Sequence, residues 1–590
     1  MSVRRMMGTE TEYAVSTDDG RRYQPVELSF KVVGGAAGAG TSHIRWDYRQ
    51  EDPLNDARGM RLPRASARPD MLTDEPQNRI VNVIAPNGGR VYVDHAHPEY
   101  SAPETMDPFS AVRYDFAGDR IMLQAARRVN AREGAHIVLH RNNVDGKGAS
   151  WGTHENYTTL RAIDFERLAD LMTLHFVARQ IFTGSGRVGL GERGERPGFQ
   201  LSQRADYVHA RIGLQTTFDR PIVNARDESH VTGSWRRLHV IVGDANRMEV
   251  PQALKLGTTS MVLWLLEHAG EGGFDLDGLL HQLRLLDPVE AMHRVSHDLT
   301  LGAPLELEHG GTTTAWQIEV RLMTAVYTLA AALHDTDSKG EPLWPDEETR
   351  RTMAMWRQAL ADVAALRHAG DEERMAMREP AGRLEWLLKW QLMERLRRKA
   401  NLGWDDPRLA ALDLSWAALD PARSVFAKLE SQTERLDGDE GDDDGDADDA
   451  RIRRAMAEPP EDTRAWLRAE LIRRFPDDVV AASWSHVTVR NDGGGDGIGD
   501  AGTVSDGQCD RHDAGHGDGA RTDAAGCDAM ASAKASDAEG NRIAPAGHGL
   551  ISLDISEAAK WNKASCEQVL KDSERLGETA ARTLARLARL

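Results

Sequence analysis

Three oxygen-bearing side chains in residues 91–100 could bind a metal and a nucleotide. Tyr92 and Asp94 lie two residues apart in an alternating β-branched run, so a strand would point both to one face. Pro98 cannot donate a hydrogen bond within a sheet, so we predict that the strand ends there and that Glu99 turns back towards Asp94. Two such carboxylates commonly bind Mg²⁺ with a nucleotide. A solvent-exposed strand end is the alternative interpretation.

A second pair of carboxylates lies near the start of the chain. Glu10 and Glu12 would share one face of a strand, with Thr9 and Thr11 on the other. Two inward-facing carboxylates are costly unless a cation or an arginine pairs with them. The pair therefore indicates a metal site, or else an outward, solvated strand face.

Residues 142–157 form a polar stretch that we interpret as a loop ending in His154, Glu155 and Asn156. It begins like the zinc-protease motif H-E-x-x-H, but position 158 is threonine, which excludes that class. Imidazole, carboxylate and carboxamide groups in a row could serve a nucleotide-phosphate and Mg²⁺ site, or could cap a turn. The G-x-G-x-x-G match at 184–189 follows a helical run rather than a buried strand, so NAD binding is not expected.

Arg237 and His239 would share one face of a strand over 235–242. Leu238 and Val240 would occupy the opposite face. Such a strand could line a site for an anionic ligand, and it also describes an ordinary half-buried strand.

The elements around these residues predict an α+β fold. Strand patterns cover residues 6–16, 81–94, 136–142, 205–217 and 235–242, and a further strand is expected at 487–490. Helical patterns cover 107–132, 163–182, 250–269, 317–334, 346–367 and 382–400, with a final helix over 555–590. Strands followed mainly by helices favour a curved antiparallel sheet over a doubly wound fold.

The charge of the chain is concentrated in two segments. The net charge is −20, but residues 437–449 contain nine acids and no base, and residues 491–542 contain eleven acids and four bases. The rest of the chain is therefore nearly neutral and can form basic patches for an acidic partner. All three cysteines lie late, at 509, 527 and 566. The chemistry of the first 500 residues must therefore use oxygen and nitrogen ligands, which suits Mg²⁺.

We expect a cytoplasmic protein that binds neither a membrane nor nucleic acid. No run approaches the ~20 apolar residues of a membrane helix. The basic start of the chain continues into Gly8 and Thr9 without the apolar run of a signal peptide.

Several stretches together resemble the Pup ligase and depupylase family of the glutamine-synthetase-like carboxylate–amine ligase superfamily. The resemblance covers about residues 4–490 and rests on residues 5–13, Arg45-Trp46-Asp47-Tyr48, Asp56-Ala57-Arg58-Gly59, and residues 91–104, 142–157, 183–189, 197–204 and 236–246. It implies a concave antiparallel sheet backed by helices, with a smaller C-terminal domain. The corresponding division is a catalytic domain over 1–430, with a flexible active-site loop at 36–80, and an acidic solvated segment over 431–450. The C-terminal domain follows over 451–590, with a disordered acidic insertion at 491–542.

The resemblance also implies roles for individual residues. It assigns Asp94 as the catalytic carboxylate and Glu10, Tyr92, Glu99 and His154 as Mg²⁺ ligands. It assigns nucleotide contacts to Arg90, Ala102, Asn156, Arg237, His239 and Trp484. At position 102 the ligases have a threonine, so a contact from Ala102 would have to come from its backbone.

Two features favour the cleaving branch of the family over the ligases. The ligases have Val-Gly-Ser before His-Pro-Glu, whereas this chain has only His95-Ala96, and segment 36–80 resembles an extra loop of the depupylases. The implied activity is deamidation of the C-terminal Gln of Pup and cleavage of Pup–lysine isopeptide bonds, with ATP and Mg²⁺ as cofactors and Pup and pupylated proteins as partners. A Pup ligase and a non-catalytic Pup- or nucleotide-binding relative are the alternatives. Whether Asp94 acts as nucleophile or as general base stays open.

Overall fold

A computed structural model describes most of the chain. The described residues are 2–38, 41–67, 82–146, 148–189, 196–228, 230–231, 233–436, 446–491, 543–545, 549–557 and 560–590. The expected acidic segment lies partly outside them, but helix α14 (Asp446–Ala457) begins within its last residues. Residues 492–542 of the expected insertion also lie outside the described residues.

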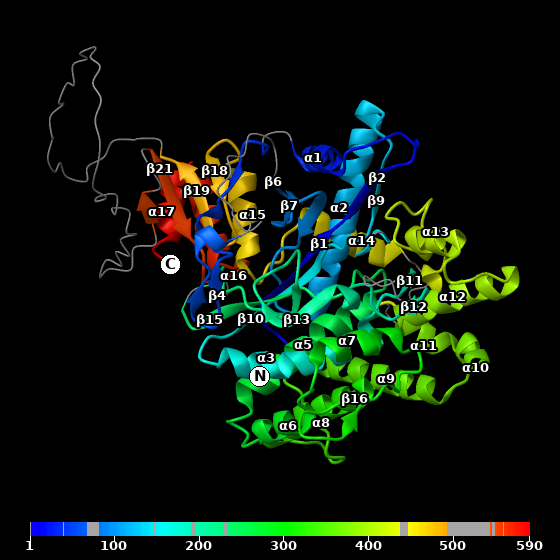
Figure 1. Ribbon diagram of the computed structural model, residues 1–590. Helices are drawn as coiled ribbons and strands as arrows, with labels where there is room; N and C mark the ends of the chain where they lie inside the picture. Colours follow the sequence, from blue (N-terminus) through cyan, green and yellow to red (C-terminus); the bar gives the residue numbers. More distant parts are fainter. Residues whose placement is uncertain are drawn as a thin grey trace, which may run out of the picture.

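A six-stranded antiparallel sheet forms the centre of the molecule (Figure 1). In spatial order its strands are β15 (Trp235–Val240), β10 (Thr153–Leu160), β1 (Met7–Glu12), β8 (His97–Ser101), β7 (Arg90–Asp94) and β6 (Asn82–Ile84). The predicted strands over 6–16, 81–94 and 235–242 are therefore found, and the α+β fold class is confirmed. The first is split because β2 (Ala14–Thr17) leaves this sheet to pair with β9 (Ile137–His140), and the second because a hairpin turn separates β6 from β7.

Two sequence interpretations were wrong. Residues 153–160 form strand β10, which lies between β15 and β1, not the end of a polar loop, because Glu155 on its rear face is buried in an ion pair with Arg179. The strand before Pro98 ends earlier, at Asp94, in a turn where His95 adopts φ 50°. Pro98 lies inside β8, where its carbonyl accepts a hydrogen bond from the Tyr13 backbone N–H at 3.0 Å. The missing proline donor is therefore not needed there.

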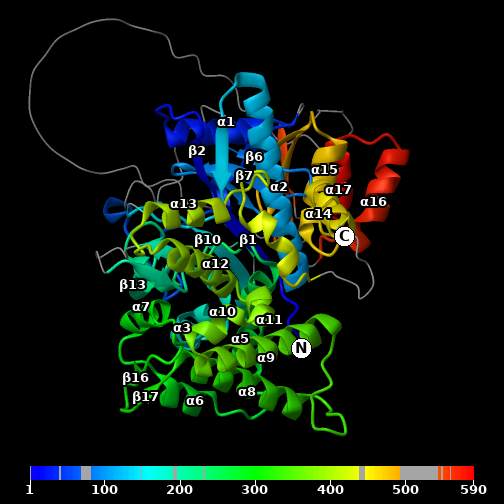
Figure 2. The same cartoon turned by 90° about the vertical axis from the view of Figure 1, so that its right-hand side faces the viewer.

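Helices α2 (Pro108–Glu133) and α5 (Glu249–His268) contact the rear of the sheet. Helix α2 starts sharply, because the Asp107 carboxylate accepts hydrogen bonds from the backbone N–H groups of Phe109 and Ser110 and proline occupies the first turn. Figure 2 shows α2 running alongside the strands. The Thr9 and Thr11 hydroxyls donate to Asp115 of α2, which confirms that β1 turns these threonines away from Glu10 and Glu12.

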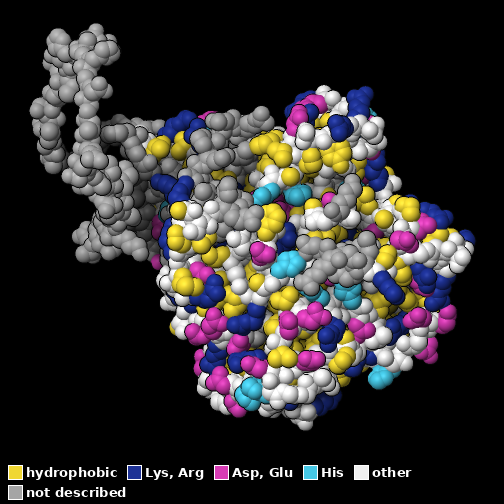
Figure 3. Space-filling view, in the orientation of Figure 1, with side chains coloured by type: hydrophobic (Ala, Val, Ile, Leu, Met, Phe, Trp, Pro, Cys, Tyr) yellow, Lys and Arg dark blue, Asp and Glu magenta, His cyan; other side chains and the backbone are white. Residues whose placement is uncertain are grey.

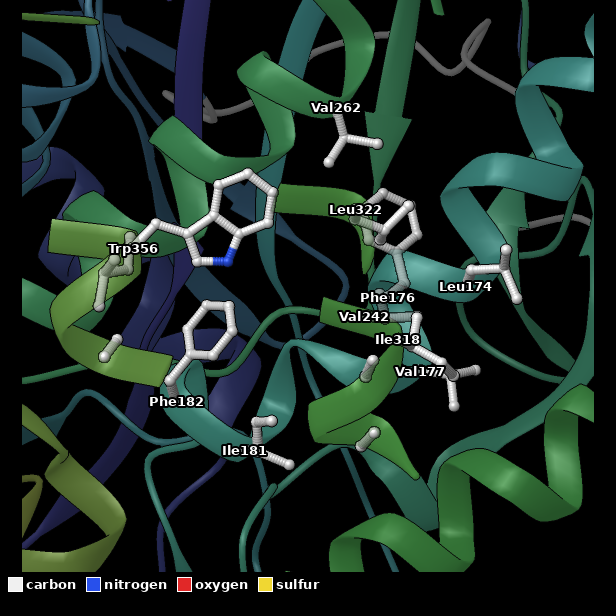
Figure 4. Close-up of a cluster of buried hydrophobic side chains, with 14 of the residues drawn as sticks. Leu174, Phe176, Val177, Ile181, Phe182, Val242, Val262, Ile318, Leu322 and Trp356 are labelled. Carbon is white, nitrogen blue, oxygen red and sulfur yellow. The ribbon is translucent and has the colours of Figure 1, made fainter. Parts of the chain in front are cut away.

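A layer of helices below the sheet contains the main hydrophobic core. Figure 4 shows Trp356, Phe182 and Leu322 converging there from three different helices. The helices of this part are α3 (Phe165–Ala178), α4 (Gln180–Thr183), α6 (Leu276–Leu283), α7 (Pro288–His297), α8 (Ala315–Leu333), α9 (Glu347–His368), α10 (Asp371–Ala376), α11 (Arg378–Arg383), α12 (Glu385–Ala400) and α13 (Pro407–Trp416). Each of the helical patterns predicted before residue 400 lies on one or two helices of the structure.

Short strand pairs connect these helices. They are β11 (Arg187–Gly189) with β12 (Gly198–Gln200), β13 (Val208–Gly213) with β14 (Arg220–Asn224), and β16 (Leu305–Glu306) with β17 (Thr312–Thr313). Of the strand predicted over 205–217, only the middle part, Val208–Gly213, is strand (β13), because residues Ala205–Tyr207 form a turn of 3-10 helix and the chain leaves the strand after Gly213.

The C-terminal residues form a second, smaller sheet with its own core, at the left of Figure 1. Its strands are β20 (Ile543–Pro545), β21 (Leu550–Asp554), β19 (His486–Arg490), β18 (Val479–Ala482) and β3 (Arg45–Trp46). Helices α15 (Arg464–Arg474), α16 (Lys563–Arg575) and α17 (Ala580–Leu587) belong to this part, so the predicted final helix is two helices. Strand β3 comes from the irregular segment 36–80 and pairs in parallel with β18.

The N-terminal part contains the remaining elements, α1 (Pro25–Ala36) and the pair β4 (Asn55–Asp56) and β5 (Met60–Arg61). In the described part of the chain, no helix combines the length and the apolar character needed to cross a membrane.

Candidate active site

The hairpin of β7 and β8 brings the first three candidate residues together. Tyr92 and Glu99 are cross-strand partners, and the Tyr92 hydroxyl donates to Glu99 Oε1 at 2.5 Å. Asp94 lies at the end of β7 beside the turn, with its side chain 39% exposed. Its carboxylate is 2.8 Å from His95 Nδ1. The hairpin therefore places one buried and one accessible carboxylate at the same end of the sheet.

Glu10 of β1 is the centre of a second group. It faces His154 across the β1–β10 pair, and its Oε2 lies 3.2 Å from His154 Nδ1 and 3.6 Å from His239 Nε2. Its Oε1 accepts hydrogen bonds from Asn156 at 3.0 Å and from Arg237 at 3.1 Å. Four of the candidate residues from two adjacent strands thus converge on one carboxylate.

Glycine at position 152 is needed for this packing. A Cβ there would lie 2.1 Å from His154 Nε2, so any other residue would displace the imidazole. The Gly152 backbone N–H also donates to the Glu12 carboxylate. Glu12 lies on the same face of β1 as Glu10, but a backbone N–H group already donates to its carboxylate.

Burial and nearby charges shift the pKa values of these carboxyl groups in opposite directions. Burial alone would raise the pKa of Glu10, but the hydrogen bond with His154, the nearby His239 imidazole and the charge of Arg237 hold it well below its usual range. Burial and the neighbouring charge of Asp94 raise the pKa of Glu99 well above its usual value. The front of the sheet therefore contains more negative charge than its own cations neutralise.

The pKa values of Asp94 and His239 are also lowered. Burial would raise the pKa of Asp94, but the hydrogen bond from His95 and the charges of His154 and Arg226 lower it overall. Burial, with the charge of Arg237, lowers the pKa of His239 to about 3. At neutral pH, Asp94 is therefore ionised and His239 is a neutral imidazole.

A divalent cation fits the donor atoms of this face. Among the described residues, Glu99 Oε2 is buried without a hydrogen-bond partner, and the same is true of both ring nitrogens of His239. Within the described residues, two groups bring three possible ligand atoms within 4.8 Å of one another: Glu10, His154 and His239, and Glu12, Asp94 and His95. Carboxylates suit Mg²⁺, while imidazoles would also suit a transition metal.

Arg90 lies at the edge of the same cleft among aromatic rings. Its guanidinium carbon is 3.9 Å from the Tyr92 ring centroid and 4.2 Å from that of Trp46, and an Arg90 nitrogen lies 3.5 Å from a Glu51 oxygen. Trp46 and Glu51 belong to segment 36–80, so part of that segment forms one wall of the cleft.

An apolar pocket adjoins this polar cleft. Ala102, Met6 and Met7 line it, and Trp484 lines both spaces. The Ala102 backbone N–H already donates to the Thr9 carbonyl at 2.8 Å, so that N–H is not available to a ligand. An apolar pocket beside carboxylates and arginines can hold a planar base with its charged phosphates in the polar cleft.

Sequence reasoning did not find four residues that line this cleft. They are Glu51, Arg226, Glu228 and His230. Glu228 pairs with Arg237 at 2.7 Å, and Arg226 lies near the hairpin end that carries Asp94. These residues lie in irregular segments without periodicity, and only the tertiary fold brings them to the sheet. Figure 3 shows histidine and acidic side chains near the centre of the face seen in Figure 1.

An antiparallel sheet that carries carboxylates, histidines and arginines beside an apolar pocket is typical of enzymes that bind a nucleotide with a divalent cation. The family model described as Pup-ligase protein matches residues 5–488. The chain therefore belongs to the Pup-ligase protein family.

Individual relatives agree with this assignment. The chain is 41% identical over 504 residues to the Pup deamidase/depupylase of Mycolicibacterium smegmatis, which covers 84% of this chain and 93% of the relative. It is similar to a solved complex of Pup and its ligase PafA, with a TM-score of 0.63, 28% identity, and coverage of 82% of this chain and 87% of the other. For PafA in complex with ADP the TM-score is 0.57, with 29% identity and coverage of 69% and 84%. Both likenesses support the glutamine-synthetase-like fold inferred from the sequence.

Proposed function

We propose that this protein is an ATP- and Mg²⁺-dependent amidohydrolase that deamidates the C-terminal Gln of Pup and cleaves the isopeptide bond between Pup and substrate lysines. The observation that carries the proposal is the β7–β8 hairpin, which holds ionised Asp94 beside buried Glu99. A reactive carboxylate next to a candidate cation site is suited to attack on an amide carbonyl.

Comparison within the family supports cleavage over ligation. Identity is 40–41% with the named depupylases over 82–84% of this chain, and 34–36% with the named Pup–protein ligases over 70% of it. The turn between β7 and β8 contains only His95 and Ala96, whereas the ligases carry Val-Gly-Ser before the same His-Pro-Glu. Pup and pupylated proteins are accordingly the proposed partners. The cytoplasmic location stays a prediction.

Asp94 is the proposed catalytic carboxylate, and two routes use it. In one, an Asp94 oxygen attacks the carbonyl carbon, the C–N bond breaks, and water then hydrolyses the resulting acyl–Asp94 anhydride. In the other, Asp94 removes a proton from the water that attacks the carbonyl. Both need ionised Asp94, which the hydrogen bond with His95 favours. In both, the amine leaves with an added proton.

The metal and nucleotide would be held by the residues around Glu10. Glu10, Glu99 and His154 would bind Mg²⁺, with Tyr92 as a neutral oxygen donor, and the cation would polarise the carbonyl oxygen. Asn156, Arg237 and His239 would orient the nucleotide phosphates, Arg90 would contribute positive charge at the cleft edge, and Ala102 and Trp484 would border the base. The ADP complex of a ligase relative supports nucleotide binding. Since amide hydrolysis is downhill, we propose ATP as a bound cofactor rather than an energy source.

One mass-spectrometric assay separates the candidate functions. The protein is incubated with Mg²⁺ and ATP and with Pup ending in Gln, with a Pup-conjugated protein, or with Pup ending in Glu plus a lysine-bearing protein. Conversion of Gln to Glu and release of free Pup support the proposal. Conjugate formation with stoichiometric ADP would instead identify a ligase, and no change in any reaction would leave only a binding protein.

A further inference from the structure

The arginines that line the cleft differ in whether a carboxylate of the protein balances their charge. Arg237 contacts Glu10 and Glu228 at 3.1 and 2.7 Å, and an Arg90 nitrogen lies 3.5 Å from Glu51. In the adjoining apolar pocket Arg464 contacts Glu104 at 2.7 Å. Within the described part of the chain, Arg226 has no carboxylate oxygen within 4.0 Å, so its charge is available to a ligand.

The position of Arg226 is nonetheless well fixed. Its Nε donates to the Leu214 carbonyl at 3.1 Å, and one terminal nitrogen donates to the Thr216 hydroxyl at 3.2 Å. Its backbone N–H donates to the Asn224 side chain at 2.9 Å, and residues 225 and 227 bond to the backbone of residues 57 and 55. A guanidinium has five N–H donors, so Arg226 retains three in a preset orientation.

Arg226 and Thr216 line the same cleft as Asp94 and His95. The sheet side of this cleft is acidic, with Glu10 and Asp94 in its lining and Glu99 directly behind Tyr92. An anionic ligand that approaches Asp94 therefore meets repulsion from the sheet, and Arg226 is the cation that can offset it.

The proposed substrate carries such an anion close to the reacting bond. In the C-terminal Gln of Pup, or in a C-terminal Glu joined to lysine, the side-chain carbonyl reacts while the free α-carboxylate is four bonds away. A reacting carbonyl at Asp94 therefore brings a second carboxylate into the acidic cleft. Arginine binds a carboxylate with two parallel hydrogen bonds, which also fixes its orientation.

We propose that Arg226, with Thr216 beside it, binds the free α-carboxylate of the substrate's C-terminal residue and so restricts the enzyme to chain-terminal Gln or Glu side chains. This inference rests on the function proposed above. It explains why an internal glutamine would be a poor substrate, since an amide in place of the carboxylate leaves Arg226 unpaired in the complex.

The test compares two substrates and three enzymes. Pup ending in Gln is prepared with a free α-carboxylate and with an α-carboxamide, and kcat/KM for side-chain deamidation is measured by intact mass with Mg²⁺ and ATP. For the unmodified enzyme we expect the carboxamide to lower kcat/KM by about 100-fold. Arg226→Gln should lower kcat/KM for the carboxylate substrate by a similar factor and leave the carboxamide substrate within about threefold, so the preference disappears. Arg226→Lys should retain part of the preference for the carboxylate substrate.

Arg211→Gln is the matched control, because Arg211 of nearby β13 pairs with Glu166 and Asp170 away from the cleft. It should keep the full preference. An Arg226→Gln enzyme that slows on both substrates equally would overturn the proposal. An accompanying loss of ATP affinity would then assign Arg226 to a phosphate, and unchanged ATP affinity would assign it to the developing oxyanion.

Folding and function are checked separately. ATP affinity and the unfolding midpoint of each variant are measured alongside the kinetics, and if Arg226→Gln does not fold, the unmodified enzyme still decides between the two substrates. Equal rates on both substrates would remove the Arg226 assignment alone. Failure to convert either substrate would remove the proposed function itself.

Discussion

Acidic groups lie on both faces of the six-stranded sheet, but the protein pairs them more fully on the rear face than on the front face. On the rear face, Glu155 forms two hydrogen bonds with Arg179, at 2.6 and 2.9 Å, and both side chains are buried. Also on the rear, Asp115 receives the Thr9 and Thr11 hydroxyls and pairs with Arg141. Each of these carboxylates has an arginine of the protein as its partner.

On the front face, the carboxylates are only partly matched. Glu99 Oε2 has no hydrogen-bond partner, Asp94 is held by His95 at the cleft mouth, and Arg237 divides its charge between Glu10 and Glu228. Buried charge alone therefore does not mark a functional site. Charge that the protein leaves unmatched does, because a ligand must complete it.

The largest expected effect is on the front face. Asp94→Asn keeps the shape of the side chain but removes the ionised oxygen, so turnover of Pup ending in Gln should fall by about 10³-fold or more. ATP affinity should stay within about twofold, since Asp94 is not among the proposed nucleotide contacts. Intact-mass kinetics and a nucleotide titration measure the two quantities. Turnover that survives in the variant would exclude Asp94 as the catalytic group.

The corresponding rear-face change should affect stability instead. Arg179→Met leaves the buried Glu155 carboxylate without its arginine, with only the Tyr157 hydroxyl still donating to it, which should lower the free energy of unfolding by about 3–5 kcal/mol. Arg350→Met is the control, because the Arg350–Glu347 pair is more than 60% exposed on both sides and its loss should leave the denaturation midpoint unchanged. Equal effects of the two substitutions in urea denaturation would contradict the contrast between the faces.

Parts of this contrast could be predicted from the sequence. Alternation alone placed Glu10 and Glu12 opposite Thr9 and Thr11, because side chains on a strand alternate strictly. Strand β10 could not be found in this way, since its rear-facing Glu155 looks like a loop residue until Arg179, distant in the sequence, is packed against it. Arg226 and His230 lie in irregular chain and have no local signal.

Replacing Glu99, the buried front-face carboxyl group that lacks a partner for one oxygen among the described residues, should stabilise the ligand-free protein. The folded state retains a proton on Glu99 that the unfolded chain releases near its ordinary pKa of 4.5. The raised pKa therefore makes stability fall as pH rises above about 4.5 towards the folded value. Glu99→Gln abolishes this titration and should therefore stabilise the protein more near pH 7.5 than near pH 5, as measured by chemical denaturation without divalent cations.

Glu104→Gln provides the opposite case. Burial would raise the pKa of Glu104, but the charges of Arg468 and Arg464 lower it to about 2. The ionised Glu104 side chain therefore stabilises the folded protein fully above about pH 4.5, and this contribution is lost as the pH falls towards 2. Glu104→Gln should accordingly destabilise the protein at pH 7.5. Glu99→Gln, in contrast, should stabilise the ligand-free protein at this pH. A loss of stability in that variant would show that charge repulsion does not destabilise the front face.

The smallest expected effect concerns the apolar pocket. Trp484 packs edge-on against Trp46 at 5.1 Å between ring centroids, and the Arg468 guanidinium lies 4.9 Å from its ring. Trp484→Phe retains an aromatic ring but reduces its area, so the Kd for ATP should rise about three- to tenfold. Trp404→Phe, in a ring contact with Phe199 elsewhere, should leave it unchanged. Equal Kd values for both variants would place the base outside this pocket.

The proton balance of metal binding tests whether the Glu99 carboxyl group belongs to a cation site. Mg²⁺ is titrated calorimetrically at pH 6 into the protein with a non-hydrolysable ATP analogue, in two buffers of different ionisation enthalpy. Because burial and the charge of Asp94 raise the pKa of Glu99, and a cation bound there favours the ionised carboxylate, the unmodified protein should release protons as Mg²⁺ binds, and Glu99→Gln should bind Mg²⁺ more weakly with less release. Equal affinity and equal proton release in the two proteins would contradict the account.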